Sequence, residues 1–200
     1  MRIAAIILAA GESRRMGRAK ALLPFRGGTF LSVLFDTLLP YCSPVVAVFG
    51  FNGEIVAEGT PAGMVAAINR DYRLGMLSSL QTGLRALADP VDRVMFTLVD
   101  HPAISRATVA KLIATRADIA IPRIDGKRGH PVLVSREIAR EFLAEPATSK
   151  VRDVIDRHAG AIRYLEVDDP GICDDVDNPA LYEALLAREA ARAQPEDSTV

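Results

Sequence analysis

The chain has 200 residues, half of them hydrophobic, with 24 basic and 25 acidic side chains and a formal net charge of -1. This length suits one domain with a substantial core, and the composition is not that of a disordered chain. The balanced charge argues against nucleic acid as a partner, because nucleic-acid-binding domains usually carry a basic excess. It leaves room for a local basic pocket that binds a small anion.

Short apolar runs alternate with segments of helical periodicity. The continuous apolar run at residues 3–9 predicts a strand buried on both faces. Further strands are predicted at residues 45–49, 64–68, 94–99, 119–121, 132–134 and 162–167. Helices are predicted at residues 29–39, 78–88, 105–116, 148–158 and 179–191. The alternation predicts an α/β sandwich with a mostly parallel sheet, in one domain over residues 1–190, followed by a frayed polar tail at residues 191–200.

Cysteine content and the N-terminal segment indicate the compartment. The only cysteines, Cys42 and Cys173, favour reduced structural thiols, since secreted chains of this size more often carry a disulfide framework. The apolar run at residues 3–9 is too short to cross a bilayer and leads into a basic, glycine-containing loop rather than a cleavage site. We therefore expect a cytoplasmic protein without a membrane partner.

The loop after the first strand contains two glycines, a serine and four basic side chains, within residues 10–20. Glycine lets backbone N–H groups approach phosphate oxygens, which arginine and lysine also bind. The end of a strand is where open α/β sheets bind ligands. The loop lacks both the P-loop ending and the Rossmann glycine spacing. Phosphate binding and an ordinary solvated loop both remain open on composition alone.

Acidic residues follow two later elements. Asp100 comes directly after the predicted strand at residues 94–99, where a carboxylate suits Mg2+ beside a phosphate loop. A capping role in the turn is the alternative, and we expect His101 to be an exposed turn residue. The run at residues 174–179 offers further carboxylates, and there Asn178 also fits a helix cap before Pro179.

The first loop then points to a family. Leu8-Ala9-Ala10-Gly11-x-Ser13-x-Arg15-Met16-Gly17-x-x-Lys20 resembles the signature of the MobA-like NTP transferases. Four later segments match that family in order, at residues 75–84, 100–102, 129–131 and 174–179, with Asn178 in place of the family's threonine. The resemblance covers nearly the whole chain. It implies a three-layer α/β sandwich with a Rossmann-like sheet of the nucleotide-diphospho-sugar transferase type.

The resemblance also implies roles for individual residues. Lys20, Arg15 and Asp100 would be catalytic, with Lys20 neutralising charge at the α-phosphate. Nucleotide-binding residues would be Leu8, Ala9, Ala10, Gly11, Ser13, Gly17, Asn69, Gly75, Ser78 and Ser79. Mg2+ would be held by Asp100 together with Asp175 or Asp177. The acceptor would be bound by His130, Lys127 and Arg128.

The Leu-Ala-Ala-Gly opening resembles the molybdenum cofactor cytidylyltransferase branch, whereas the guanylyl branch more often has Leu-Ala-Gly-Gly. The implied activity is transfer of CMP from CTP to the phosphate of a molybdopterin-type acceptor, with a recipient molybdoenzyme as a further partner. Three alternatives stay open: guanylyl transfer, a sugar or alcohol phosphate acceptor, and a non-catalytic carrier of the molybdenum cofactor. Neither the base nor the oligomeric state follows from the residues alone.

Overall fold

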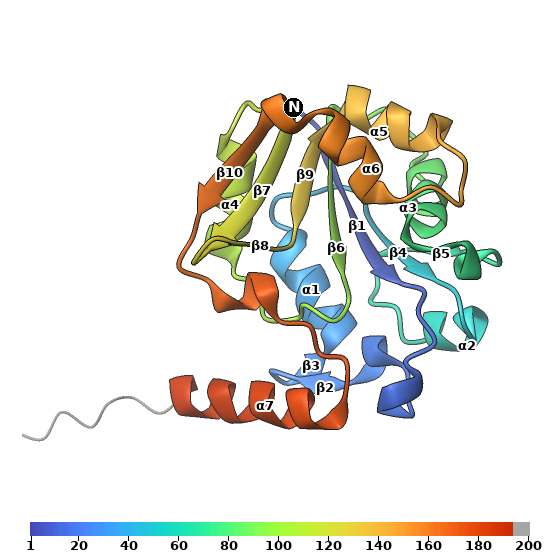
Figure 1. Ribbon diagram of the computed structural model, residues 1–200. Helices are drawn as coiled ribbons and strands as arrows, with labels where there is room; N and C mark the ends of the chain where they lie inside the picture. Colours follow the sequence, from blue (N-terminus) through green and yellow to red (C-terminus); the bar gives the residue numbers. More distant parts are fainter. Residues whose placement is uncertain (194–200) are drawn as a thin grey trace, which may run out of the picture.

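The computed structural model describes residues 1–193 as a central sheet with helices on both faces (Figure 1). The sheet has eight strands, in the order β10-β7-β9-β6-β1-β4-β5, with β8 paired to β7. Their bounds are β1 Ile3–Ala9, β4 Val45–Phe49, β5 Val65–Ile68, β6 Arg93–Leu98, β7 Ile119–Ile124, β8 Lys127–Arg128, β9 Val132–Ser135 and β10 Ile162–Glu166. A separate hairpin joins β2 (Pro24–Phe25) to β3 (Gly28–Thr29).

Most neighbouring strands run parallel. β1 pairs parallel with both β4 and β6, β4 with β5, and β7 with β10. The exceptions are β9, which is antiparallel to β6 and β7, and the short β8. The three layers and the mostly parallel sheet confirm the predicted fold class. The reversal at β9 was not predicted, because strand direction is set by pairing partners that are distant in sequence.

The helices are α1 Phe30–Leu38, α2 Gly53–Ala57, α3 Met76–Arg85, α4 Arg106–Ala114, α5 Arg136–Ala144, α6 Val151–Arg157 and α7 Pro179–Ala193. Predicted helix starts are confirmed at two caps. The Ser105 hydroxyl accepts from the Thr108 amide at 3.1 Å, and the Asn178 side chain accepts from the Leu181 amide at 3.0 Å. α7 extends to Ala193, into the predicted tail, whose residues 194–200 lie outside the described part.

The sheet has an apolar layer on each face. In β1, Ala5 and Ile7 belong to the cluster that packs on α1 and α4, whereas Ala4 and Ile6 belong to the cluster that packs on α3, α5 and α6. All four side chains are fully buried. This confirms the inference that a continuously apolar run marks a strand covered on both faces.

Helix α5 was missed by the sequence analysis. It buries Ile138, Ala139 and Phe142 at helical spacing, and its first turn is capped by the Ser135 hydroxyl. That cap and that spacing were readable in the sequence. No helix among residues 1–193 is long and apolar enough to cross a bilayer.

Candidate functional site

A cavity of about 370 Å³ opens where β1 and β6 end. It gathers segments that are far apart in the chain: the first loop, the start of α3, the turn after β6 and the segment before α7. The predicted residues that line it are Leu8, Ala9, Ala10, Gly11, Ser13, Arg15, Lys20, Gly75, Ser79, Asp100 and Asp177. Most of the predicted nucleotide site therefore faces one space.

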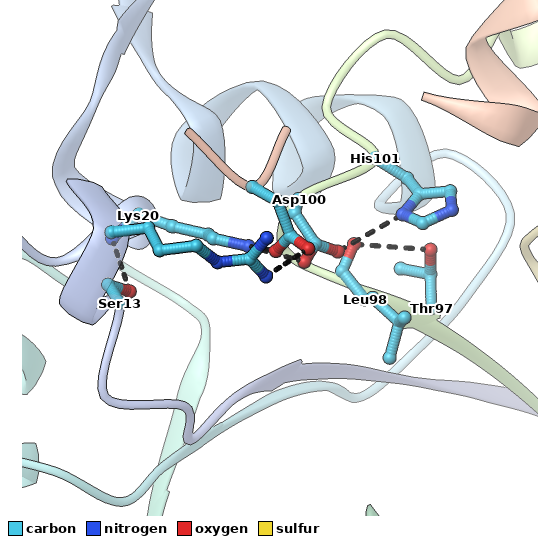
Figure 2. Close-up of polar contacts among 8 residues, drawn as sticks. Ser13, Lys20, Thr97, Leu98, Asp100 and His101 are labelled. Atoms are coloured by element: carbon cyan, nitrogen blue, oxygen red, sulfur yellow. Dashed lines mark hydrogen bonds and ion pairs between the residues drawn. The ribbon is translucent and has the colours of Figure 1, made fainter. Parts of the chain in front are cut away.

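The first loop curls back on itself through local backbone hydrogen bonds. Ser13 and Gly17 both adopt positive φ, 50° and 67°. The Ser13 carbonyl accepts from the Met16 amide at 2.9 Å, and the Ser13 hydroxyl accepts from the Lys20 amide at 3.3 Å (Figure 2). The curl turns Lys20 toward the turn that carries Asp100. Gly17 lies on the outer side of the loop, facing a different cavity.

Lys20 connects two acidic residues at the cavity wall. Its ammonium lies 2.8 Å from the Asp100 carboxylate and 2.5 Å from the Asp177 carboxylate. Arg15 lies 2.5 Å from the other oxygen of Asp177. Burial opposes ionisation of Lys20, but hydrogen bonds to the two carboxylates outweigh it and raise the lysine pKa. The lysine is therefore held charged in a half-buried position.

Asp100, Asp175 and Asp177 form an acidic cluster. Each offers one carboxylate oxygen, and these atoms lie within 4.8 Å of one another. The pKa of Asp175 is raised, by burial first and then by the charges of Asp100 and Asp177. Hard oxygen donors at this spacing, next to a cavity that Arg15 and Lys20 line, fit Mg2+ or Mn2+. The predicted set of metal ligands thus converges in space, from segments 75 residues apart.

His101 corrects an expectation. Instead of being exposed in the turn, it is only 7% exposed, because its ring packs edge-on against His130 with ring centroids 5.0 Å apart. Its Nδ1 lies 3.1 Å from the Asp100 carboxylate. Burial alone would raise the pKa of Asp100, but His101 and Lys20 lower it to about 2. Asp100 is accordingly an ionised carboxylate held from both sides (Figure 2).

Asn69 binds two serines at the start of α3, next to the cavity. Its amide group donates to the hydroxyls of Ser78 and Ser79, at 2.9 and 3.0 Å, and its oxygen accepts from the Asp71 amide. Asn69 and Ser78 are buried and do not line the cavity, whereas Ser79 does. The structure therefore places two predicted nucleotide-binding residues in a supporting position.

Tyr72 is a cavity residue that the sequence analysis missed. Its hydroxyl donates to Glu12 at 3.1 Å, and Arg14 and Arg73 also pair with Glu12, so this carboxylate connects the loop to the segment before α3. A Cβ on Gly50 would lie 2.6 Å from the Tyr72 Cβ, so only glycine leaves room for the ring. No local pattern in the sequence marks Tyr72.

A second cavity, of about 580 Å³, adjoins the first at Gly75 and Met76, which line both. Arg128, Gly129 and His130 line it, while the predicted acceptor residue Lys127 is exposed and lines neither cavity. Burial and the neighbouring His101 lower the pKa of His130 to about 4, so this ring is neutral at pH 7. The two cavities meet beside Asp100 and His101.

Solved structures share this architecture. The Rv0371c protein of Mycobacterium tuberculosis H37Rv superimposes with a TM-score of 0.80 at 25% identity, covering 94% of this chain and 98% of that one. The same mycobacterial protein has been solved in complex with manganese, with a TM-score of 0.75 at 24% identity, covering 94% and 99%. These likenesses agree with the nucleotide-diphospho-sugar transferase type of sandwich.

Sequence relatives carry three different names. A molybdenum cofactor cytidylyltransferase of Escherichia coli (strain K12) is 30% identical over 87% of this chain and 90% of its own length. A nicotine blue oxidoreductase of Paenarthrobacter nicotinovorans is 34% identical over 66% and 70%. A probable molybdenum cofactor guanylyltransferase of Mycolicibacterium paratuberculosis is 36% identical over 61% and 64%. The MobA-like NTP transferase domain matches residues 5–162, and the chain belongs to this family.

Proposed function

We propose that this protein transfers CMP from CTP to the phosphate of a molybdopterin-type molybdenum cofactor and releases pyrophosphate. The observation that carries the proposal is the position of Lys20 between Asp100 and Asp177, on the wall of the cavity that the first loop encloses. The E. coli cytidylyltransferase, matched over most of both chains, supports the choice of reaction.

In this proposal the loop from Gly11 to Lys20 binds the triphosphate of CTP. Asp100, with Asp175 or Asp177, would hold a divalent ion, Mg2+ by expectation, and the bound ion would neutralise phosphate charge. Lys20 and Arg15 then stabilise the charge that develops on the transferred phosphate and on the leaving pyrophosphate. The manganese complex of the mycobacterial protein supports a divalent ion in this fold.

The second cavity receives the acceptor, with His130 and Arg128 among its walls. A terminal phosphate oxygen of the acceptor attacks the α-phosphorus, and the bond between that phosphorus and the pyrophosphate oxygen breaks. The acceptor phosphate is already anionic at neutral pH, so no strong general base is required. Catalysis then depends on positioning and on charge neutralisation.

The preference for CTP over GTP is assigned to Ala10. This residue is 8% exposed and lines the nucleotide cavity, where its methyl group would crowd a purine more than a pyrimidine. A thermal-shift screen of CTP, GTP, ATP and UTP with Mg2+ tests the base, because a ligand that binds only the folded state raises its melting temperature. A shift with GTP that exceeds the shift with CTP would overturn the cytidylyl assignment, and Ala10→Gly should move the preference toward GTP.

Activity is tested by incubating the purified protein with Mg2+, CTP and molybdenum-loaded molybdopterin, and following pyrophosphate release and the mass of the product. The expected product is the cytosine dinucleotide of the cofactor, ready for a recipient molybdoenzyme. If pyrophosphate is released only with sugar or alcohol phosphates, the acceptor is a phosphate of that class and not molybdopterin. Tight cofactor binding without turnover of any NTP would favour a carrier.

A further inference from the structure

Arg188 of α7 binds the side chain that comes directly before two of the proposed metal ligands. Two nitrogens of its guanidinium donate to the two carboxylate oxygens of Asp174, one of them at 2.8 Å. The two side chains are 33% and 13% exposed, so the pair is largely shielded from water. A bidentate pair of this kind fixes orientation as well as distance. It therefore ties the segment 174–178 to the helix that follows it.

Asp174 stands apart from the acidic cluster although it is next to Asp175 in the sequence. The cluster contains Asp175 and Asp177, with Asp100, and does not include Asp174. Asp174 does not line the nucleotide cavity, whereas Asp177 does. The residues 174–177 thus carry three carboxylates, of which one is directed toward α7 and two toward Asp100. Arg188 supplies the cation that pairs with the first of them.

Helix α7 can hold this segment because the helix is itself anchored, to the core and to the hairpin of β2 and β3 beside which it lies (Figure 1). Tyr182 and Leu185 belong to the core cluster on that side of the sheet and are 9% and 3% exposed. The Tyr182 hydroxyl also donates to the Pro24 carbonyl at 2.7 Å. These contacts lie within two turns of Arg188, so its guanidinium starts from a fixed part of the helix.

The segment 174–178 also touches the turn after β6, where carboxylates of the cluster repel one another. The Val176 amide donates to the Asp100 carbonyl at 3.2 Å. On either side of this contact are Asp175 and Asp177, and the pKa of Asp175 is raised by burial and then by the charges of Asp100 and Asp177. A restraint from outside the cluster opposes that repulsion, and the pair of Arg188 with Asp174 is placed to supply it.

We infer that Arg188 is a positioning residue for the divalent-ion site: by binding Asp174, it holds the segment 174–178 so that Asp175 and Asp177 face Asp100. Arg188 lines neither cavity, so it acts through Asp174 and not by touching the nucleotide or the acceptor. The inference rests on the proposed function, in which Asp100 with Asp175 or Asp177 binds the ion. The geometry of the site then depends on α7 as well as on the loops at the ends of β1 and β6.

The test removes the pair without changing the net charge. The double variant Asp174→Asn/Arg188→Met loses one negative and one positive side chain together, so the long-range electrostatic field at the acidic cluster changes little. Its affinity for Mn2+ alone, measured by isothermal titration calorimetry without nucleotide, should fall roughly tenfold, the effect of one lost charge-assisted contact. The matched control is Arg2→Met/Asp89→Asn, an exposed ion pair that lines neither cavity, and its affinity should equal that of the wild-type protein.

The inference is overturned if the Mn2+ affinity falls no further in the double variant than in the control pair. A role limited to the stability of α7 gives that result, with a lower melting temperature and an unchanged affinity in the folded protein. If the double variant does not fold, Arg188→Lys decides by the same criterion. Lysine keeps the charge but lacks the fork that binds both carboxylate oxygens, so Mn2+ binding should still weaken several-fold.

A measurement that needs no metal separates this inference from the proposed function. If the wild-type protein binds no Mn2+, the ion site of the proposed function fails. Hydrogen exchange of the Val176 amide, which donates to the Asp100 carbonyl, then decides the inference. Roughly tenfold faster exchange in the double variant than in the control pair upholds the role of Arg188 in holding the segment, and equal exchange refutes it.

Discussion

The Lys20 ammonium lies 2.5 Å from the carboxylate of Asp177, a residue 157 positions later in the chain. The same ammonium reaches Asp100, so one lysine neutralises two of the three carboxylates of the acidic cluster. Two of the three N–H groups of the ammonium are used in this way, so the proposed function leaves the third to donate to a phosphate oxygen of the nucleotide.

Replacing Lys20 should slow catalysis strongly. If Lys20 stabilises charge at the transferred phosphate, Lys20→Met should lower kcat by roughly 10²–10³, the range for losing one such electrostatic donor. The measurement is pyrophosphate release at saturating CTP and acceptor. A folded variant with unchanged kcat would show that Lys20 has no part in the chemical step.

The same substitution should strengthen metal binding in the absence of nucleotide. Without the ammonium, Asp100 and Asp177 lose a compensating charge, and Mn2+ should bind roughly tenfold more tightly, as expected for the exchange of one charge-assisted contact. Titration followed by the electron paramagnetic resonance of free Mn2+ measures this. Lys111→Met, a lysine of α4 that lines neither cavity, is the control, and equal affinities in all three proteins would contradict the prediction.

Loss of the buried Asn69 amide should affect both stability and nucleotide binding. Asn69→Ala removes the hydrogen bonds to Ser78 and Ser79 and should cost about 1–3 kcal/mol of unfolding free energy. Denaturant unfolding measures that change. The KM for CTP should also rise because Ser79 lines the cavity, and a destabilised variant with unchanged KM would limit Asn69 to a structural role.

Helix α3 approaches the sheet so closely at Gly83 that a methyl group should not fit. A Cβ there would lie 2.6 Å from a methyl carbon of Ile6 and 2.9 Å from one of Val48. Overpacking should make Gly83→Ala less stable by about 1–3 kcal/mol, despite the better helix propensity of alanine. Gly160→Ala, where a Cβ meets nothing within 4 Å, is the control and should be close to neutral by thermal unfolding.

The neutral His130 should make the protein less stable in mild acid. Its pKa falls from 6.5 to about 4 on folding, so between these values the unfolded chain binds a proton that the folded chain does not. The stability contribution is complete above pH 6.5 and is lost as the pH falls toward 4. Between pH 7 and pH 5 the loss should be at most about 2 kcal/mol.

The check is the pH dependence of urea unfolding in His130→Gln. This variant should lose that part of the acid destabilisation, whereas His158→Gln, which removes a histidine outside both cavities, should keep it. If the free energy of unfolding falls with the same slope between pH 7 and pH 5 in His130→Gln and in the wild-type protein, the ring is not held neutral by its surroundings.

Local sequence patterns determined much of the fold and marked the part of the candidate site that lies in the first loop. The apolar run of β1 and the caps at Ser105 and Asn178 are short-range features, so periodicity and residue type were sufficient to identify them. The glycines, serine and basic side chains between Gly11 and Lys20 are contiguous in the chain, so the sequence marked this loop as a candidate for phosphate binding, and the family resemblance then favoured that role over a solvated loop. The family resemblance extended this to Asp100, Asp175 and Asp177.

Tertiary structure alone decided which of these groups meet. Only packing shows that Lys20 lies between Asp100 and Asp177, that His101 is buried against His130, and that Lys127 lies outside both cavities. Strand order brings the ends of β1 and β6 together and reverses β9, and no local pattern encodes contacts between segments so far apart. Residue type determines which chemistry is available, and the pairing of distant strands determines which residues perform it together.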